Sequence, residues 1–403
     1  MPEFIISRLG LRGDGIAETD IFAPFTLPGE VVDGTPENGQ LTGKRLSDSP
    51  FRVSPVCPHF GTCGGCTLQH ASDAFLADWK VDAIRRALSA QGIDAEFRPI
   101  DTSPPHSRRR AVFSGRRTKK TTQVGFHRRG SAEILDLKEC PLLMPALLDC
   151  LPACHALAGI GASRTAEIKI SVTYSDVGAD IDVRDAKALD GPLRARLADL
   201  AGAHDLARLN WNGELVADRK HPAQSIGSAQ VLPPPGAFLQ ATPQGQAALV
   251  TAMQEAVSGA KRVLDLFAGC GTFSLPLAEQ AEVHAVEGLS EMLRALDAGW
   301  RYAKGLKTVT TETRDLFSRP LVPLELKKFD AVVIDPPRAG AKAQMAEIVA
   351  SEIKVVGAVS CNPVSFARDA KILTDGGFTL NWVKPVDQFR WSGHVELAAR
   401  FSR

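Results

Sequence analysis

The sequence has 403 residues, of which 44% are hydrophobic and 23% are charged, and this predicts a soluble globular protein of two or three domains. The net charge is only +1, so any affinity for nucleic acid must come from a local patch and not from the field of the whole molecule. The most apolar stretch, residues 142–162, is interrupted by proline and charged residues, which excludes a membrane-spanning helix.

The cysteines and the first residues indicate the compartment. Residues 1–10 lack a cationic segment followed by an apolar core, so we predict no secretory signal. The eight cysteines are unevenly spaced, which favours metal binding or catalysis over disulfides. We therefore expect a cytoplasmic protein that does not contact a membrane, and we expect it to be a monomer.

The first part of the chain combines a β-rich segment with a helix. Short apolar runs alternate with glycine-containing turns over residues 4–52, which predicts a small barrel or sheet. Apolar residues recur at helical spacing over residues 73–91, with Asp73 as the expected N-cap and Gly92 as the stop. The charged face of this helix, which includes Lys80, is expected to be solvated.

A cysteine cluster lies between these two elements. Three cysteines stand within ten residues among glycines, which let the backbone turn sharply around one centre: Cys57, Cys63 and Cys66. Cys140 is the best candidate for a fourth ligand, with Cys150 and Cys154 as alternatives. Four thiolates suit either a [4Fe-4S] cluster or tetrahedral zinc, and the spacing does not choose between them.

The middle of the chain is basic and rich in predicted strands. Residues 108–129 contain nine Lys or Arg residues, no acid, and the aromatic residues Phe113 and Phe126, a pattern typical of contact with RNA. Residues 168–183 and 204–217 each predict a pair of strands.

The last third alternates strands and helices, which predicts a doubly wound α/β sheet. Thr242 and Pro243 are expected to begin its first helix. Seven strands are predicted, at residues 262–267, 283–287, 307–311, 330–335, 354–360, 378–383 and 396–401.

Two features of this sheet predict its ligand and its chemistry. A glycine turn at 268–272 follows the first strand, and acids recur after the next strands, as Glu287, Asp315 and Asp335. The third glycine expected beneath a pyrophosphate is absent, and carboxylates suit a cationic sulfonium, so S-adenosylmethionine is favoured over NAD. Cys361 ends the fifth strand, where ligands bind in such sheets, and we predict that it is a nucleophile held as a thiolate.

These motifs together resemble those of the bacterial uridine-C5 RNA methyltransferases, specifically the iron–sulfur branch that modifies 23S ribosomal RNA. The resemblance covers nearly the whole chain and rests on the four cysteines and on a series of short motifs. These motifs are Phe238-Leu239-Gln240, Asp265-Leu266-Phe267-Ala268-Gly269-Cys270-Gly271, Asp335-Pro336-Pro337-Arg338, Ser360-Cys361-Asn362-Pro363 and His394-Val395-Glu396.

The resemblance implies specific roles. Cys361 would be the nucleophile and Glu396 the general base, with Asp335 positioned to orient the reacting base. The S-adenosylmethionine pocket would be lined by Gln240, Phe267, Thr272, Glu287, Asp315 and Asp335. A [4Fe-4S] cluster would be held by Cys57, Cys63, Cys66 and Cys140.

We therefore expect four regions. Residues 1–52 would form a TRAM- or OB-like β segment, and 53–92 the cysteine loop and helix. Residues 93–235, which contain Cys140, would form a β-rich RNA-binding domain, and 236–403 a Rossmann-like class I methyltransferase domain. The alternatives are a methyltransferase for the T-loop of tRNA, an RNA-binding or folding factor with a degenerate site, and an NAD-linked iron–sulfur reductase.

Overall fold

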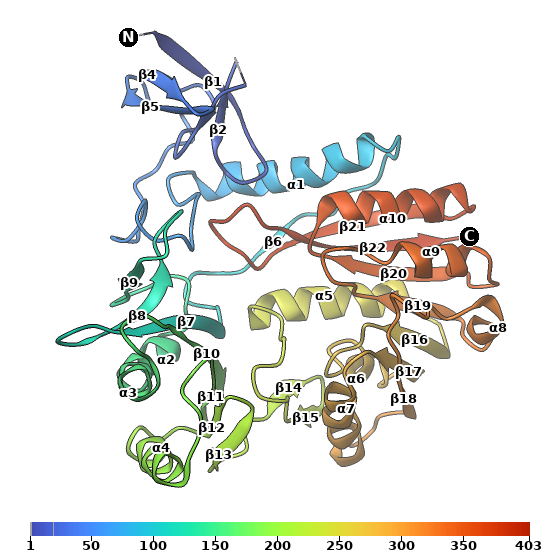
Figure 1. Ribbon diagram of the computed structural model, residues 1–403. Helices are drawn as coiled ribbons and strands as arrows, with labels where there is room; N and C mark the ends of the chain where they lie inside the picture. The colour runs from blue at the N-terminus through green and yellow to red at the C-terminus, as the bar shows by residue number, and fades with distance from the viewer. Residues whose placement is uncertain (1, 19) are drawn as a thin grey trace.

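The computed structural model describes residues 2–18 and 20–403; residues 1 and 19 of the predicted first segment lie outside the description. Figure 1 shows a small barrel, a central sheet and a larger sheet, with helix α1 (Asp73–Ser89) running between the barrel and the larger sheet. Among the described residues, every helix is too short or too polar to cross a bilayer.

The predicted N-terminal barrel is present. Its five strands close in the order β1-β2-β3-β5-β4 around buried residues that include Ile6, Val32 and Leu41. The strands are β1 (Glu3–Leu9), β2 (Gly15–Ala17), β3 (Phe22–Ala23), β4 (Val31–Glu37) and β5 (Gln40–Arg45).

The N-cap of helix α1 lies one residue before the predicted N-cap. The N-cap is Ser72, whose hydroxyl accepts from the N–H of Phe75, and not Asp73. Ile84 and Leu88 join the core of the larger sheet, so the helix belongs to that core as well as to the cysteine segment.

The central sheet has seven strands in the order β13-β12-β11-β10-β7-β8-β9. Its elements are β7 (Arg110–Arg117), β8 (Thr122–His127), β9 (Ile134–Asp136), β10 (Ile168–Ser175), β11 (Gly178–Arg184), β12 (Arg208–Trp211), β13 (Glu214–Asp218), α2 (Pro145–Leu148), α3 (Leu151–Gly161) and α4 (Gly191–Ala203). A two-stranded ribbon, β14 (Gln224–Ile226) and β15 (Ala229–Val231), follows it.

The larger sheet has the order β18-β17-β16-β19-β20-β22-β21-β6. The five strands from β16 to β20 are parallel, and β22 runs antiparallel between β20 and β21. The strands are β16 (Arg262–Leu266), β17 (Glu282–Glu287), β18 (Val309–Thr313), β19 (Ala331–Ile334), β20 (Val355–Ser360), β21 (Thr379–Asp387) and β22 (Glu396–Ser402). Its edge strand β6 (Asp101–Thr102) comes from before the central sheet, so this sheet extends beyond residues 236–403.

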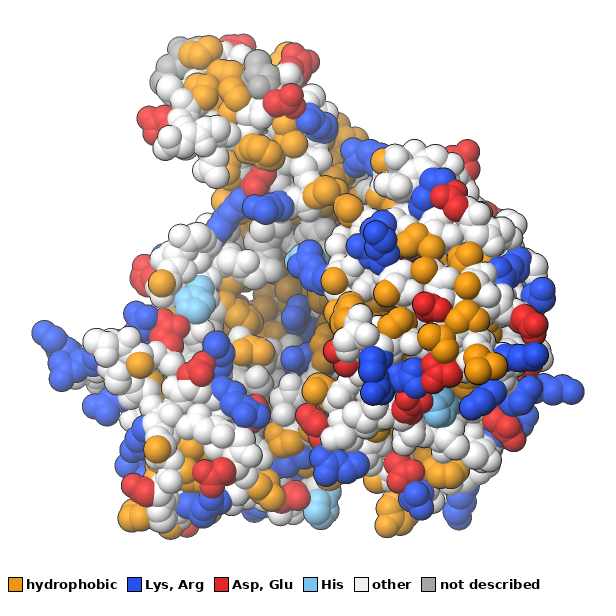
Figure 2. Space-filling view, turned by 45° about the vertical axis from the view of Figure 1, so that its right-hand side comes forward, with side chains coloured by type: hydrophobic (Ala, Val, Ile, Leu, Met, Phe, Trp, Pro, Cys, Tyr) orange, Lys and Arg blue, Asp and Glu red, His pale blue; other side chains and the backbone are white. Residues whose placement is uncertain are grey.

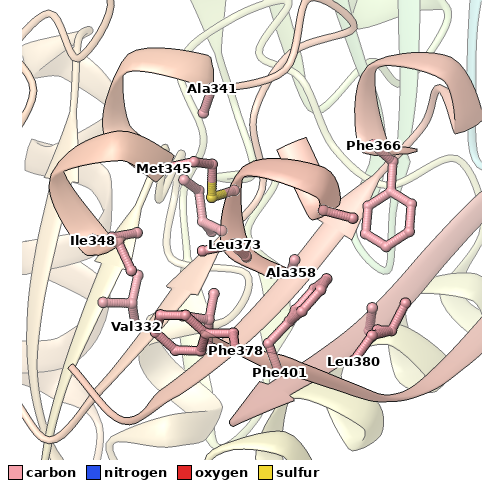
Figure 3. Packing of buried hydrophobic residues seen from close by; sticks show 14 of the residues in the cluster. Val332, Ala341, Met345, Ile348, Ala358, Phe366, Leu373, Phe378, Leu380 and Phe401 are labelled. Carbon is pink, nitrogen blue, oxygen red and sulfur yellow. The ribbon is translucent and has the colours of Figure 1, made fainter. Parts of the chain in front are cut away.

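Helices cover both faces of this sheet, as in a doubly wound α/β fold. They are α5 (Pro243–Ala256), α6 (Ser274–Leu277), α7 (Ser290–Tyr302), α8 (Pro323–Leu326), α9 (Lys342–Val349) and α10 (Pro363–Asp375). Thr242 caps α5 as predicted, accepting from the N–H of Gly245. Figure 3 shows Met345 and Phe366 packed with Phe401 in one hydrophobic core.

Candidate active site

Cys361 lines a cleft that also includes residues of the barrel. The cleft has a volume of about 910 Å³, and its walls come from barrel strands, the cysteine loop, α1 and the loops after β20 and β21. Figure 2 shows a hollow beneath the small upper lobe, with Lys and Arg side chains on its walls. The charged residues of the lining are Arg8, Arg12, Arg86 and Arg338.

The turn that carries Cys361 is held by its neighbours. The buried apolar strand β20 ends at Ser360, and Asn362 caps α10 by accepting from the N–H of Val364 at 3.1 Å. The Asn362 amide also donates to the Arg338 carbonyl at 3.1 Å. This bond joins the Cys361 turn to the Pro-Pro-Arg loop that follows β19.

Three predicted catalytic residues lie at the same edge of three adjacent strands. Asp335 follows β19, Cys361 follows β20, and Glu396 begins β22. Because the register pairs Ser360 with Leu397, Cys361 comes beside Glu396. The parallel sheet thus brings together residues that are far apart in the sequence.

These three residues repel one another as anions. Burial, with the Asp335 carboxylate, raises the pKa of Glu396 to about 8, and burial raises the pKa of Asp335 to about 7. Burial, with both carboxylates, also raises the pKa of the Cys361 thiol, which the Arg338 guanidinium opposes. Burial first, and then the two carboxylates, favour the thiol of Cys361 here, and the thiolate that we predicted for this site stays a prediction.

Sequence reasoning missed Gln388, which follows β21. Its amide Nε2 donates to Glu396 Oε2 and, at 2.6 Å, to Gln240 Oε1. Gln240 in turn donates to Asp335 Oδ2 at 3.4 Å. A chain of buried amides therefore connects two of the predicted catalytic carboxylates.

The glycine turn after β16 gathers further acids. The N–H groups of Gly269 and Leu289 each donate at 3.1 Å to the Glu287 carboxylate. The neighbouring Asp265 is fully buried, and burial, with the Asp335 and Glu287 carboxylates, raises its pKa to about 7. No donor among the described residues reaches its Oδ1, and the acids at this edge of the sheet repel one another.

Three other residues that we predicted to bind the cofactor lie in or after the loops that follow β16 and β18. Phe267, at φ +61°, and Thr272 are half-buried at the two ends of the glycine turn. Asp315 is exposed, and its carboxylate accepts from the N–H of Phe317 and the hydroxyl of Ser318. Phe317 also packs on Phe267 with ring centroids 5.5 Å apart, a contact that no sequence motif indicated.

The four predicted metal ligands line one cavity of about 280 Å³: Cys57, Cys63, Cys66 and Cys140. Burial raises the pKa of the Cys66 thiol to about 12, and the other three thiols act in the same direction. Among the described residues, no group of three or more His, Cys, Asp or Glu side chains is arranged to hold a metal ion. Cys154 is fully buried in the core of the central domain, and neither it nor Cys150 lines this cavity.

The predicted basic surface is smaller than expected. Phe113 is fully buried, Arg109 is 6% exposed, and Arg116 and Arg129 pair with Glu167 and Asp14. The exposed basic residues of the stretch are those near the β7–β8 turn, Arg117, Lys119 and Lys120. Strand formation buries alternate side chains, so a run of basic residues does not make one basic face.

Comparison with known proteins gives the family. Residues 302–403 match the profile of the tRNA (Uracil-5-)-methyltransferase family. An uncharacterized RNA methyltransferase of Rhizobium meliloti is 44% identical, covering 99% of this chain and 98% of the relative. The 23S rRNA (uracil(1939)-C(5))-methyltransferase RlmD of Photorhabdus laumondii is 30% identical over 98% and 95% of the two chains. The chain belongs to the RNA uracil-5-methyltransferase family.

The fold of this methyltransferase agrees with that assignment. The crystal structure of Pyrococcus abyssi tRNA (uracil-54, C5)-methyltransferase with S-adenosyl-L-homocysteine matches it with a TM-score of 0.78, at 22% identity and 99% coverage of both chains. The predicted α/β class I methyltransferase fold with a β-rich N-terminal region is therefore confirmed. So is the predicted enzyme class, an S-adenosylmethionine-dependent RNA uracil-C5 methyltransferase.

Proposed function

We propose that this enzyme methylates C5 of a uridine in 23S ribosomal RNA through a covalent bond between Cys361 and the base. The observation that carries the proposal is the placing of Asp335, Cys361 and Glu396 on three neighbouring strands, at the edge where ligands bind in open α/β sheets. Cys361 also lines a cleft of about 910 Å³ whose lining includes four arginines, the residue type that binds phosphate groups.

The chemistry follows from the substrate. C5 of uracil is a weak carbon nucleophile, so the Cys361 thiolate first adds to C6 and leaves the electron pair on C5 and O4 as an enolate. C5 then forms a bond to the methyl carbon while the methyl–sulfur bond breaks. The Glu396 carboxylate removes the C5 proton, and the Cys361–C6 bond breaks to return the thiolate.

The acids around the glycine turn fit the methyl donor. S-adenosylmethionine supplies the methyl group when it is bound, and its sulfonium is a cation. The mutual repulsion of Asp265, Glu287 and Asp335 would be relieved by such a cation, which would also favour the Cys361 thiolate. Gln240, Phe267, Thr272 and the more exposed Asp315 are the remaining residues we assign to this pocket.

We assign the cysteine cavity to a [4Fe-4S] cluster. Four thiols around one cavity match the number of ligands that such a cluster needs, and a cluster separates its thiolates more widely than a single ion does. Burial raises the pKa of the Cys66 thiol, and a bound metal would supply the positive charge that favours the thiolate. Cys57, Cys63, Cys66 and Cys140 would hold it.

The choice of RNA rests on this cysteine set and on the 30% identity with an enzyme named for 23S rRNA. By family resemblance, the enzymes that methylate tRNA lack the four cysteines. Residues 93–235 and the barrel would contact the RNA, and the target base would leave its stack to enter the cleft.

The test supplies tritiated methyl donor with protein-free 23S rRNA or bulk tRNA, and maps the product to a nucleotide. We expect label at C5 of a 23S uridine, and none with Cys361→Ala. Cys150→Ala is the matched control, because it removes a half-buried thiol outside the cleft. Label in tRNA alone would overturn the substrate, and label retained by Cys361→Ala would overturn the mechanism.

A further inference from the structure

The Gln388 side chain is 3% exposed and uses its full hydrogen-bonding capacity. Its Oε1 accepts from the backbone N–H of Ala241 at 2.8 Å and of Thr242 at 3.4 Å. Its Nε2 donates to Gln240 and to Glu396. A primary amide has two acceptor positions and two donor hydrogens, so no bond is left over.

These contacts determine which group donates and which accepts in every hydrogen bond between the two buried amides and the carboxylates. A backbone N–H only donates, so Gln388 must present its oxygen to residues 241 and 242 and its nitrogen to the site. Gln240 must then accept with Oε1, which turns its own Nε2 toward Asp335. The orientation of two side-chain amides is thus set by the main chain before helix α5.

The same bonds distinguish the two oxygens of Glu396. Oε2 accepts from the Gln388 amide, and this is the hydrogen bond that the Glu396 carboxylate makes among the described residues. Glu396 as a whole is 4% exposed, so its carboxylate has little freedom to find another partner. Oε1 is therefore the carboxylate oxygen whose acceptor positions are not engaged by Gln388.

We infer that Gln388 is a positioning residue for proton removal: it orients Glu396 so that Oε1 accepts the C5 proton, and it ties this base to Gln240. The inference rests on the proposed function, in which Glu396 is the base. It assigns Gln388 a part in one step only, the loss of the C5 proton after methyl transfer.

Two variants test this inference. Gln388→Met removes every bond of the amide. Gln388→Glu keeps an oxygen for residues 241 and 242 but loses the donor to Glu396, and it serves if Gln388→Met folds poorly. Gln230→Met is the control, because Gln230 is an exposed glutamine outside the site. Each protein is given RNA with uridine, with uridine deuterated at C5, and with 5-fluorouridine.

We expect both Gln388 variants to lose about 100-fold in kcat, the typical cost of a misplaced catalytic group. Each should also show a larger deuterium isotope effect than wild type and accumulate covalent adduct with ordinary uridine. Adduct formation with 5-fluorouridine, which has no C5 proton to lose, should match wild type. An isotope effect equal to that of wild type in both variants would overturn the inference.

The outcomes separate the two proposals. If wild type forms no adduct with 5-fluorouridine RNA, covalent catalysis fails and the role of Gln388 fails with it. If wild type forms the adduct and the Gln388 variants do not, Gln388 acts before proton removal, and the inference alone is wrong.

Discussion

Lys80 Nζ lies 2.6 Å from Asp387 Oδ1, and the two side chains are 0% and 4% exposed. This ion pair joins α1 to the end of β21, one residue before Gln388. Lys80 Nζ also donates to the Phe389 carbonyl at 3.2 Å. The buried charge of Lys80, on the helix that follows the cysteine loop, therefore stabilises the loop that leads to Glu396.

Lys80→Met should lower the free energy of unfolding by about 3–5 kcal/mol, because it leaves the Asp387 carboxylate buried without a cation. The additional change Asp387→Asn should recover part of the loss, since it removes the charge and keeps an acceptor for the Phe389 N–H. Thermal unfolding measures both. Arg85→Met, in an exposed pair on the same helix, should change little, and a Lys80→Met protein as stable as wild type would contradict the prediction.

Glu396→Gln should abolish turnover and raise thermal stability at pH 8. The folded protein raises the pKa of Glu396 from 4.5 to about 8, so between these pH values it retains a proton that the unfolded chain has lost. Stability therefore falls as pH rises through this window, and the neutral amide removes that fall. We expect a gain of about 1–3 kcal/mol at pH 8, scaled down from about 1.4 kcal/mol per pKa unit. Equal Tm differences at pH 4 and pH 8 would refute this.

Arg338→Ala should make Cys361 less reactive. The Arg338 guanidinium lowers the pKa of this thiol, so its removal should slow alkylation by iodoacetamide at pH 8 by about threefold to tenfold. Alkylation of Cys361 is followed by mass spectrometry across pH. Arg86→Ala removes a charge from the same cleft that is not among the main causes of the shift in the thiol pKa, and it should change the rate much less.

Removal of the proposed [4Fe-4S] cluster should loosen the loop before Glu396. The N–H groups of Thr67 and Leu68, next to Cys66, donate to the Trp391 carbonyl at 3.0 and 3.1 Å. We expect anaerobically purified protein to carry about four irons per chain, and Cys66→Ser to lose them. Hydrogen exchange at residues 388–395 should then increase. Cys150→Ser is the control, and unchanged exchange in Cys66→Ser would show that the cluster does not support this loop.

The larger sheet was predictable because parallel strands are buried on both faces and appear as continuous apolar runs. All seven of its predicted strands are present, and the motifs at their carboxyl ends meet at one edge. Cys361 and Glu396 could be paired from the sequence only through family resemblance, because strand order and register are not encoded locally.

The features that were missed depend on tertiary contacts. Lys80 was expected on a solvated face, but the end of β21 supplies Asp387 and the loop after it supplies the Phe389 carbonyl, and both contact Lys80. Gln388 stands in no motif, and its importance comes from main-chain N–H groups about 150 residues earlier in the sequence. The basic stretch appeared to be one surface because a linear charge count ignores which side of a strand each residue occupies.

The composition of the cleft also determines when it can form during synthesis of the protein. Its walls combine residues 8–12 with residues 361–364 and 392–395, and the sheet beneath it is edged by β6, which precedes the central sheet. Contacts of such sequence separation form slowly, because the segments that meet lie far apart along the polypeptide. A polypeptide still emerging from the ribosome therefore has no assembled cleft until residues 392–395 have been synthesised and can pack against residues 8–12.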